Sequence, residues 1–156
     1  MKRFKHILAT TDLSSESFAA VSYAGHLARD EGAKLSILYV PHSSTLLFSE
    51  FAPTPDLALL DSQIEQMAED KLNAWAKRHL RHVSKVNVIV QRGETHSAIC
   101  KAAADLKASV IIIATHGRKG FGHAMLGSVA ERVIRDAPCP VLVIKPPKPK
   151  ASKKTR

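Results

Sequence analysis

The feature that most constrains the fold is the regular alternation of strand-like and helix-like segments. Strand-like runs of apolar residues cover 4–11, 34–40, 85–91, 109–115 and 140–144. Segments whose apolar residues recur at helical spacing cover 16–31, 56–81, 94–106 and 127–137. The run 109–115 (SVIIIAT) reads as a strand buried on both faces. Because such alternation builds βαβ units, the pattern predicts one parallel sheet with helices on both faces.

Residues at the predicted helix ends and faces support this pattern. Ser14 and Ser15 are N-cap types ahead of the first helix, and Gly32 stands where a C-cap is expected after it. We expect the long second helix to bury one apolar face, formed by Leu57, Leu60, Ile64, Met67, Leu72, Trp75 and Leu80. Trp75 is expected to belong to the core and not to a stacking platform for a ligand. The third helix is expected to bury Ile99, Cys100 and Ala103, and the last helix Val129, Val133 and Ile134.

Length and composition indicate one globular domain. The chain has 156 residues, of which 45% are hydrophobic and 24% charged, which excludes collagen, a disordered chain and a disulfide scaffold. Neither a run long enough to span a bilayer nor a secretory signal is recognised. Cys100 and Cys139 have no metal-site spacing, so we expect two reduced, mostly buried thiols in a cytoplasmic protein.

The positive charge is concentrated at the end of the chain. The net charge is +9, and the stretch 145–156 (KPPKPKASKKTR) holds six basic residues and no acid. We therefore expect a domain over 1–145 followed by a disordered basic tail over 146–156. The tail is interpreted as a solvated appendage that contacts nucleic acid only weakly, since no aromatic residues interleave its charges.

The segment 114–128 (ATHGRKGFGHAMLGS) carries the clearest chemical signal. It leaves the carboxyl end of the most apolar strand and enters a helix N-terminus, where ligands of open α/β sheets bind. Its glycines let the backbone approach an anion closely, and the free N–H groups of the helix attract phosphate. The segment has no GxGxxG, and Gly122-x4-Gly127-Ser128 lacks the lysine of a P-loop. The sequence predicts a phosphate cradle of another type.

This segment resembles the universal stress protein family, whose ATP-binding members carry Gly-x2-Gly-x9-Gly-Ser/Thr at this place. The register here is Ala114-x2-Gly117-x9-Gly127-Ser128, with alanine where the family has its first glycine. The stretches ILATTDLSSES (7–17) and GSVAERVIRDAPCPVLVIK (127–145) are also close to the family's usual wording, and the resemblance covers about 3–145. It implies an adenine nucleotide alpha-hydrolase-like fold with one open five-stranded parallel sheet in the order 3-2-1-4-5.

The resemblance also implies a nucleotide site and a dimer. Asp12 would contact the nucleoside, the backbone of Val40 the adenine, and Gly117, Gly127 and Ser128 the ribose and phosphates. The predicted ligand is ATP, with Mg²⁺ bridged to its phosphates, and the dimer would pair the strand over 141–144. The full set of predicted nucleotide-binding residues is Thr11, Asp12, Val40, Ala114, His116, Gly117, Arg118, Gly120, Gly127, Ser128 and Val129.

Structural roles for these residues remain open alternatives. Asp12 could cap the first helix, the glycines could serve turns alone, and Ser128 could be a capping hydroxyl. Arg118 could contact a phosphate, although solvated loop charges are the commoner case.

Four functions follow from these observations. The first is an ATP-binding regulatory module with at most slow hydrolysis, since no general base or arginine finger is identified. The second, adenylyl or nucleotidyl transfer, lacks its HxGH or SGGxDS signature. The third is a stress-related dimer that does not bind nucleotide. The fourth is nucleic-acid binding through the basic tail.

Overall fold

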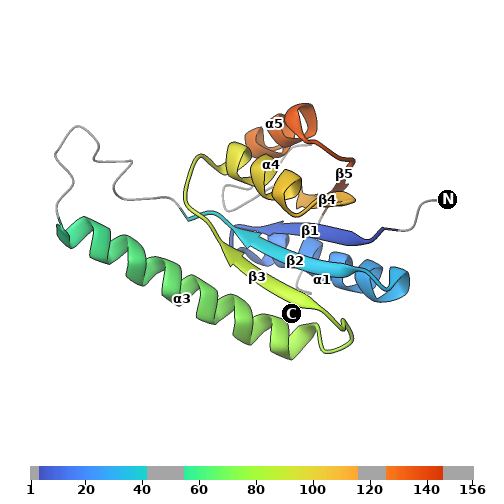
Figure 1. Cartoon of the computed structure of the whole chain (residues 1–156), viewed down its shortest axis with the longest axis horizontal. Coiled ribbons are helices and arrows are strands. Elements are labelled where there is room, and N and C mark those ends of the chain that lie inside the picture. Colours follow the sequence, from blue (N-terminus) through green and yellow to red (C-terminus); the bar gives the residue numbers. More distant parts are fainter. Residues whose placement is uncertain (1–3, 42–54, 116–125, 146–156) are drawn as a thin grey trace, which may run out of the picture.

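The computed structural model describes residues 4–41, 55–115 and 126–145 (Figure 1). Four predicted nucleotide-binding residues, namely His116, Gly117, Arg118 and Gly120, lie outside the described residues. So do the segment 42–54 and the basic stretch 146–156, so the predicted disorder of that tail is not tested.

The described chain alternates strands and helices as the sequence predicts. The strands are β1 (His6–Thr11), β2 (Lys34–Tyr39), β3 (Val86–Val90), β4 (Val110–Ala114) and β5 (Val141–Ile144). The helices are α1 (Ser15–Glu31), α3 (Pro55–His79), α4 (Thr95–Asp105) and α5 (Ser128–Asp136). All strands pair in parallel, and their order is β3-β2-β1-β4-β5. The predicted sheet and its order are confirmed.

Two apolar layers cover the sheet, one on each face. On one side, α1 and α3 pack on alternate residues of the strands, among them Ile7, Ile37 and Ile112. On the other side, α4 and α5 pack on the intervening residues, among them Leu8, Leu38 and Ile111. β1 and β4 therefore bury both of their faces, which explains their continuous apolar runs.

The helix ends follow the local sequence. Ser14 caps α1 by accepting the backbone N–H of Ser17, and Glu94 caps α4 by accepting the backbone N–H of Ser97. Gly32 ends α1 with a left-handed φ of 65°, as expected for a C-cap glycine.

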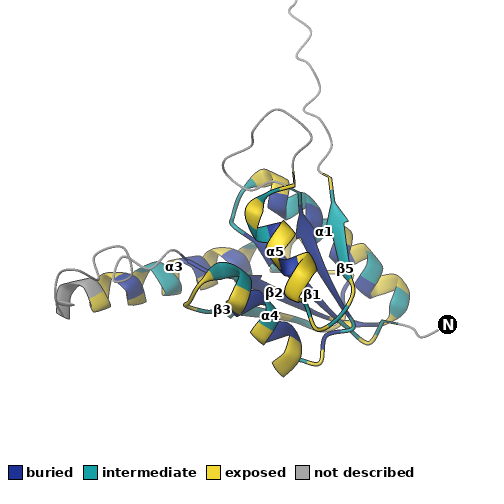
Figure 2. Ribbon diagram, turned by 90° about the horizontal axis from the view of Figure 1, so that it is seen from above, coloured by how far each residue is buried: buried dark blue, intermediate teal, exposed yellow. Residues whose placement is uncertain are grey.

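The predicted buried face of α3 is partly wrong. Leu72 and Leu80 are buried, but Met67 and Leu60 are 72% and 44% exposed. The buried positions of the helix include Asp61 and Ala68 instead. Leu60 and Met67 each stand one position before Asp61 and Ala68, so they lie about 100° around the helix from the buried residues. The helix is also much longer than β3, and its first half extends past the end of that strand (Figures 1 and 2).

Trp75 lies in the second half of α3, where the prediction holds. It is partly buried, packs against the core, and stacks on Phe18 of α1 with ring centroids 4.6 Å apart. His79 stacks on the tryptophan at the same separation. The indole is therefore a packing element between the two helices.

Three further burial predictions need correction. Ile134 of α5 is 46% exposed, and Ala130 is buried in its place together with Val133. Cys100 and Cys139 are free thiols that are only half-buried. This partial burial raises the pKa of both thiols.

No helix in the described part of the chain is long and apolar enough to cross a membrane.

Candidate nucleotide site

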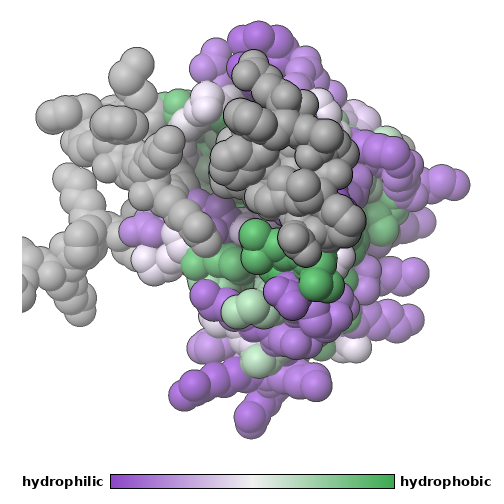
Figure 3. All heavy atoms as spheres, turned by 90° about the vertical axis from the view of Figure 1, so that its left-hand side faces the viewer, coloured by the Kyte–Doolittle hydropathy of each residue, from purple (hydrophilic) through white to green (hydrophobic). Residues whose placement is uncertain are grey.

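The described members of the predicted site come together at the carboxyl edge of the sheet. Thr11 ends β1, Val40 follows β2, Ala114 ends β4, and Gly127 precedes α5. β1 and β4 are neighbours, yet α1 leaves β1 toward one face while α5 covers the other. Such a divergence of connections opens a crevice at the strand ends, and ligands of open α/β sheets bind there. Figure 3 views the molecule from this edge and shows apolar surface bordered by polar residues.

The turn from β1 to α1 is held by its own hydroxyl and carboxyl groups. Asp12 Oδ1 accepts the backbone N–H of Ser14 at 3.0 Å and the hydroxyl of Ser14 at 2.5 Å. Thr11 Oγ1 lies 2.8 Å from Ser17 Oγ and accepts the backbone N–H of Leu13. Leu13 adopts a left-handed φ of 67°, which costs energy for a non-glycine residue. Asp12 is therefore not the N-cap of α1, which is Ser14. Its carboxylate instead holds Ser14 in the turn from which the helix begins.

The connection between β4 and α5 is closed by one backbone hydrogen bond. The N–H of Gly127 donates to the carbonyl of Thr115 at 2.9 Å. A Cβ on Gly127 would lie 3.1 Å from that same carbonyl oxygen, which is tighter than an ordinary contact. The φ of Gly127 is −63°, so glycine is favoured here by the close approach and not by the backbone conformation.

The N-terminus of α5 differs from those of α1 and α4. Its N-cap is Gly127, and no side-chain hydrogen bond from the described residues caps it. The first helical hydrogen bond within the described chain is donated by Glu131 to the carbonyl of Gly127. The N–H groups of Ser128, Val129 and Ala130 therefore face the start of the helix, where the helix dipole favours negative charge. Ser128 is exposed and adds a hydroxyl donor.

Val40 and Ala114 are only 8% exposed, so they offer backbone more than side chain. Ala114 is not among the described residues with a positive φ. The alanine at the family's glycine position therefore causes no backbone strain.

Two polar residues near this edge did not stand out in the sequence. The carbonyl of Thr115 accepts the N–H of Gly127. Its position directly after β4 is the only sequence feature that could have indicated this role. Arg92 follows β3 and pairs with Glu65 of α3. That partner raises the pKa of the guanidinium, and Asp61 contributes further. The pairing of Arg92 with α3 depends on tertiary contacts that the sequence does not reveal.

Metal ligation by protein side chains is not indicated. Among residues 4–41, 55–115 and 126–145, no group of three or more His, Cys, Asp or Glu could hold an ion. The arrangement instead suits an anion at the start of α5 and a polar group near Asp12.

The comparison with known proteins agrees with this geometry. The model of the universal stress protein family matches residues 3–145. Universal stress protein MJ0531 of Methanocaldococcus jannaschii is 31% identical over 145 residues, which is 93% of this chain and 84% of that protein. The solved structure of MJ0577, from the same organism, has a TM-score of 0.79 at 28% identity and covers 95% of this chain and 100% of that chain.

Two further solved structures are nucleotide complexes. One is a universal stress protein in complex with cAMP, with a TM-score of 0.65 at 21% identity, covering 92% of this chain and 98% of that one. The other is the universal stress protein from Archaeoglobus fulgidus in complex with dAMP, with a TM-score of 0.62 at 20% identity, covering 93% and 100%. At these identities the likeness shows the fold.

The fold and its edge define a class, namely small single-sheet α/β proteins with the strand order 3-2-1-4-5 and a glycine-capped helix after the fourth strand. Within that class, the chain belongs to the universal stress protein family.

Proposed function

We propose that the protein is an adenine-nucleotide-binding regulatory module of the stress response that works in the cytoplasm. The observation that carries the proposal is the start of α5, where Gly127 is tied to Thr115 and no described side chain caps the helix. Free N–H groups at such a helix start bind phosphate oxygens without any further residue. The two nucleotide complexes in the family support adenine nucleotide as the ligand class.

The described residues divide the ligand between them. The N–H groups of Ser128 and Val129, with the Ser128 hydroxyl, would hold phosphate oxygens. Asp12, at the end of the neighbouring strand, would accept a hydroxyl of the nucleoside, and the backbone at Val40 would meet the base. His116, Gly117, Arg118 and Gly120 stay predictions as further contacts.

ATP is the proposed ligand, with Mg²⁺ held by its phosphates. The group supplies charge that the helix start complements, and the residues described above bind and orient it. We expect at most slow hydrolysis, because the residues that the structure describes include no group assigned as a general base for an attacking water.

Occupancy would be coupled to assembly through β5. Val141–Ile144 form an edge strand on which all four apolar residues are half-buried. An exposed apolar edge of this kind is a template for pairing with a second strand. β5 pairs in register with β4, and Ala114 at the end of β4 lies opposite Ile144, so the nucleotide edge and the dimer strand are in contact.

The test is the small molecule that purifies with the protein. The protein is denatured, and the supernatant is analysed by absorbance and mass. Thermal melting is then followed with ATP and Mg²⁺, with dAMP, and with GTP as the control for base identity. The expected result is an adenine nucleotide in the supernatant and a rise in melting temperature with ATP but not with GTP.

The alternative is a stress-related dimer that does not bind nucleotide. The observation in its favour is Ala114 at the position of the family's first glycine. An empty supernatant together with a melting temperature that saturating ATP leaves unchanged would establish this alternative and overturn the proposed site.

A further inference from the structure

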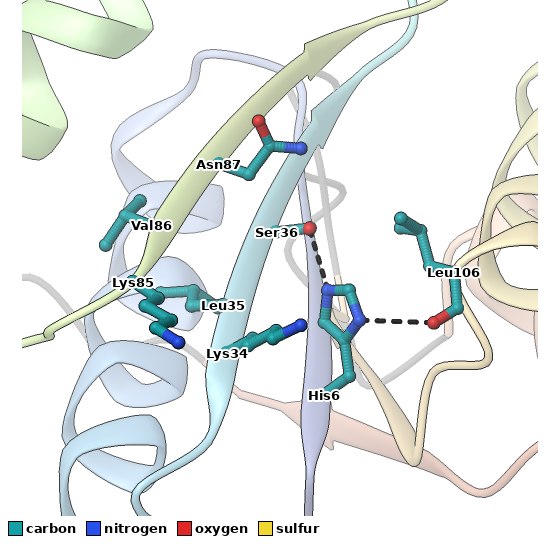
Figure 4. Close-up of a pocket in the computed structure, with 8 residues that line it drawn as sticks. All are labelled: His6, Lys34, Leu35, Ser36, Lys85, Val86, Asn87 and Leu106. Carbon is teal, nitrogen blue, oxygen red and sulfur yellow. Dashed lines mark hydrogen bonds between the residues drawn. The ribbon is translucent and has the colours of Figure 1, made fainter.

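A second cavity lies at the opposite, amino edge of the sheet. It has a volume of about 230 Å³ and is open to solvent at the first residues of β1, β2 and β3 (Figure 4). Its polar lining includes His6, Ser36 and Asn87, one residue from each of the three strands, with Lys34 and Lys85 beside them. None of these residues belongs to the nucleotide site.

The cavity arises from the way the helices cover this face. His6, Ser36 and Asn87 each lie two residues before a member of the apolar layer under α4 and α5, so they point to that same face. Ser36 is in register with Asn87, which makes a polar row across the strands. At this end the layer stops at Leu106, the C-cap of α4, which leaves Asn87 and both lysines exposed.

The hydrogen bonds of His6 define the tautomer of its neutral ring. Its Nδ1 lies 3.1 Å from the carbonyl of Leu106, and because a carbonyl only accepts, Nδ1 carries the hydrogen. Its Nε2 lies 2.9 Å from Ser36 Oγ, and in the neutral ring Nε2 accepts the hydroxyl hydrogen of Ser36. Burial holds the pKa of His6 below its usual value and Lys34 adds to this, against the opposing effect of the Leu106 carbonyl.

Lys34 and Lys85 bring positive charge to the mouth of this cavity, and both also line a neighbouring pocket that includes Glu31. Among the residues that the structure describes, neither Lys34 nor Lys85 forms an ion pair, and no carboxylate lines the cavity. Figure 4 shows the ammonium group of Lys34 reaching toward the His6 ring. Two ammonium groups, an amide and a hydroxyl offer many donors around one hollow, which is the chemistry that recognises an oxyanion.

We propose that this cavity is a second ligand site, for a small dianion that presents phosphate or paired carboxylate oxygens. Its volume lies below the ~300 Å³ of the smallest pockets for drug-sized ligands, so the ligand has few heavy atoms. Lys34 and Lys85 bind its charge, and the side-chain amide of Asn87 donates to one oxygen.

His6 and Ser36 complete the site through a proton. When the dianion cancels the charge of Lys34, His6 takes up a proton from solvent at Nε2, and this N–H then donates a hydrogen bond to Ser36 Oγ. The hydroxyl hydrogen of Ser36 then turns toward the ligand. Lys34 and Lys85 are the other charged groups that line the cavity, and the α4 side contributes the uncharged carbonyl of Leu106. Glu31 lines the neighbouring pocket that both lysines share.

The experiment is a titration of the full chain followed by NMR of its backbone amides and histidine rings. One arm uses inorganic phosphate and the other succinate, both at constant ionic strength in chloride. Saturable shifts at Ser36 and Asn87, with a rise in the pKa of His6, are expected in at least one arm. Saturation with phosphate alone would identify phosphate compounds as the ligand class, and saturation with succinate alone would identify dicarboxylates. Saturation with both would identify a general dianion site.

Variants separate a built site from surface charge. The double variant Lys34→Met/Lys85→Met should bind at least ten times more weakly. The matched control Lys71→Met/Lys77→Met removes the same charge from exposed positions of α3 and should bind as the parent does. Should the first variant fold poorly, Asn87→Leu tests the same cavity at an exposed position.

Several results would overturn the proposal. They are shifts that grow linearly without saturation, equal weakening in both double variants, a His6 pKa that no anion changes, or shifts confined to Gly127 and Ser128. The last result would place the anion at the nucleotide site, so the two proposals fail separately.

Discussion

The backbone N–H of Gly127 is hydrogen-bonded to the carbonyl of Thr115 at 2.9 Å, which joins the end of β4 to the start of α5. The two residues are twelve positions apart in the sequence, yet they set the position of the helix N-terminus over the carboxyl edge of the sheet. The proposed binding geometry therefore depends on a contact that leaves little room for a side chain at Gly127.

Replacing this glycine should abolish nucleotide retention. In Gly127→Val, a Cβ 3.1 Å from the Thr115 oxygen forces the helix start away from β4, so the N–H groups no longer converge on one point. We expect no nucleotide in the supernatant of the denatured variant and a stability loss of about 1–2 kcal/mol. The control is Gly32→Ala, with no heavy atom within 4 Å of the new Cβ but a positive φ, which should cost about 1 kcal/mol and leave retention intact. Full retention in Gly127→Val would remove this contact from the mechanism.

Asp12 should contribute separately to the turn and to the ligand. Asp12→Asn keeps an oxygen that can accept from Ser14 but loses the charge, so stability should change little while nucleotide affinity falls about tenfold. Asp12→Ala removes the acceptor as well and should also lose about 1 kcal/mol of stability. Calorimetric titration and urea unfolding measure the two effects. Unchanged affinity in both variants would leave Asp12 with its role in the turn before α1 alone.

Glu94 should stabilise α4 in a way that depends on pH. Its carboxylate accepts the backbone N–H and the hydroxyl of Ser97 and pairs with His96, which lowers its pKa to about 2. Since folding lowers the pKa of Glu94, the stabilisation is fully present above about pH 4.5 and is lost as the pH falls toward 2. Glu94→Ala should cost about 1 kcal/mol at pH 7, and the difference from the parent should vanish near pH 2. Urea unfolding across that range checks this, and a constant difference would contradict it.

His6 should make the protein less stable in mild acid. Its pKa in the folded chain lies below the ordinary 6.5, so below that pH the unfolded chain binds a proton that the folded chain does not. Stability should therefore fall as the pH decreases through 6.5 and be unaffected by this group above it. His6→Gln should flatten the decline between pH 7.5 and 5.5, measured by urea unfolding in buffers without phosphate. Parallel curves of stability against pH for the variant and the parent would show that His6 does not cause the decline.

The two halves of α3 should differ in their tolerance of substitution. Leu72 is fully buried, so Leu72→Ala should cost about 2–5 kcal/mol. Met67 is 72% exposed on the half that extends past β3, so Met67→Gln should change stability by less than about 0.5 kcal/mol. Thermal or urea unfolding measures both. A large loss in Met67→Gln would show that this face of the helix is covered in solution.

The order of elements follows from the sequence because it depends on local patterns. Apolar runs and helical spacing identify the strands and helices to within a few residues, and Gly32 marks the end of α1 as expected. The glycine segment after the fourth strand predicts an anion site at one edge of the sheet, since a parallel sheet brings the carboxyl ends of all its strands to that edge.

Other features could not be predicted because they depend on what lies beneath each residue. Met67 and Leu72 are both apolar residues of α3, but only Leu72 lies on the side of the helix that also buries Asp61 and Ala68. Ile134 is exposed for the same reason, because Ala130 and Val133 occupy the contact with the sheet. The bond from Gly127 to Thr115 and the pair formed by Arg92 and Glu65 join residues that are far apart in sequence.

The sequence by itself determines that this chain is a doubly wound α/β domain of a known family, because periodicity and motif spacing are local properties. The tertiary structure alone decides which apolar residues are buried, why Gly127 has to be small, and that His6, Ser36 and Asn87 meet at the amino edge. Those facts depend on distances between separate elements, and only packing sets such distances.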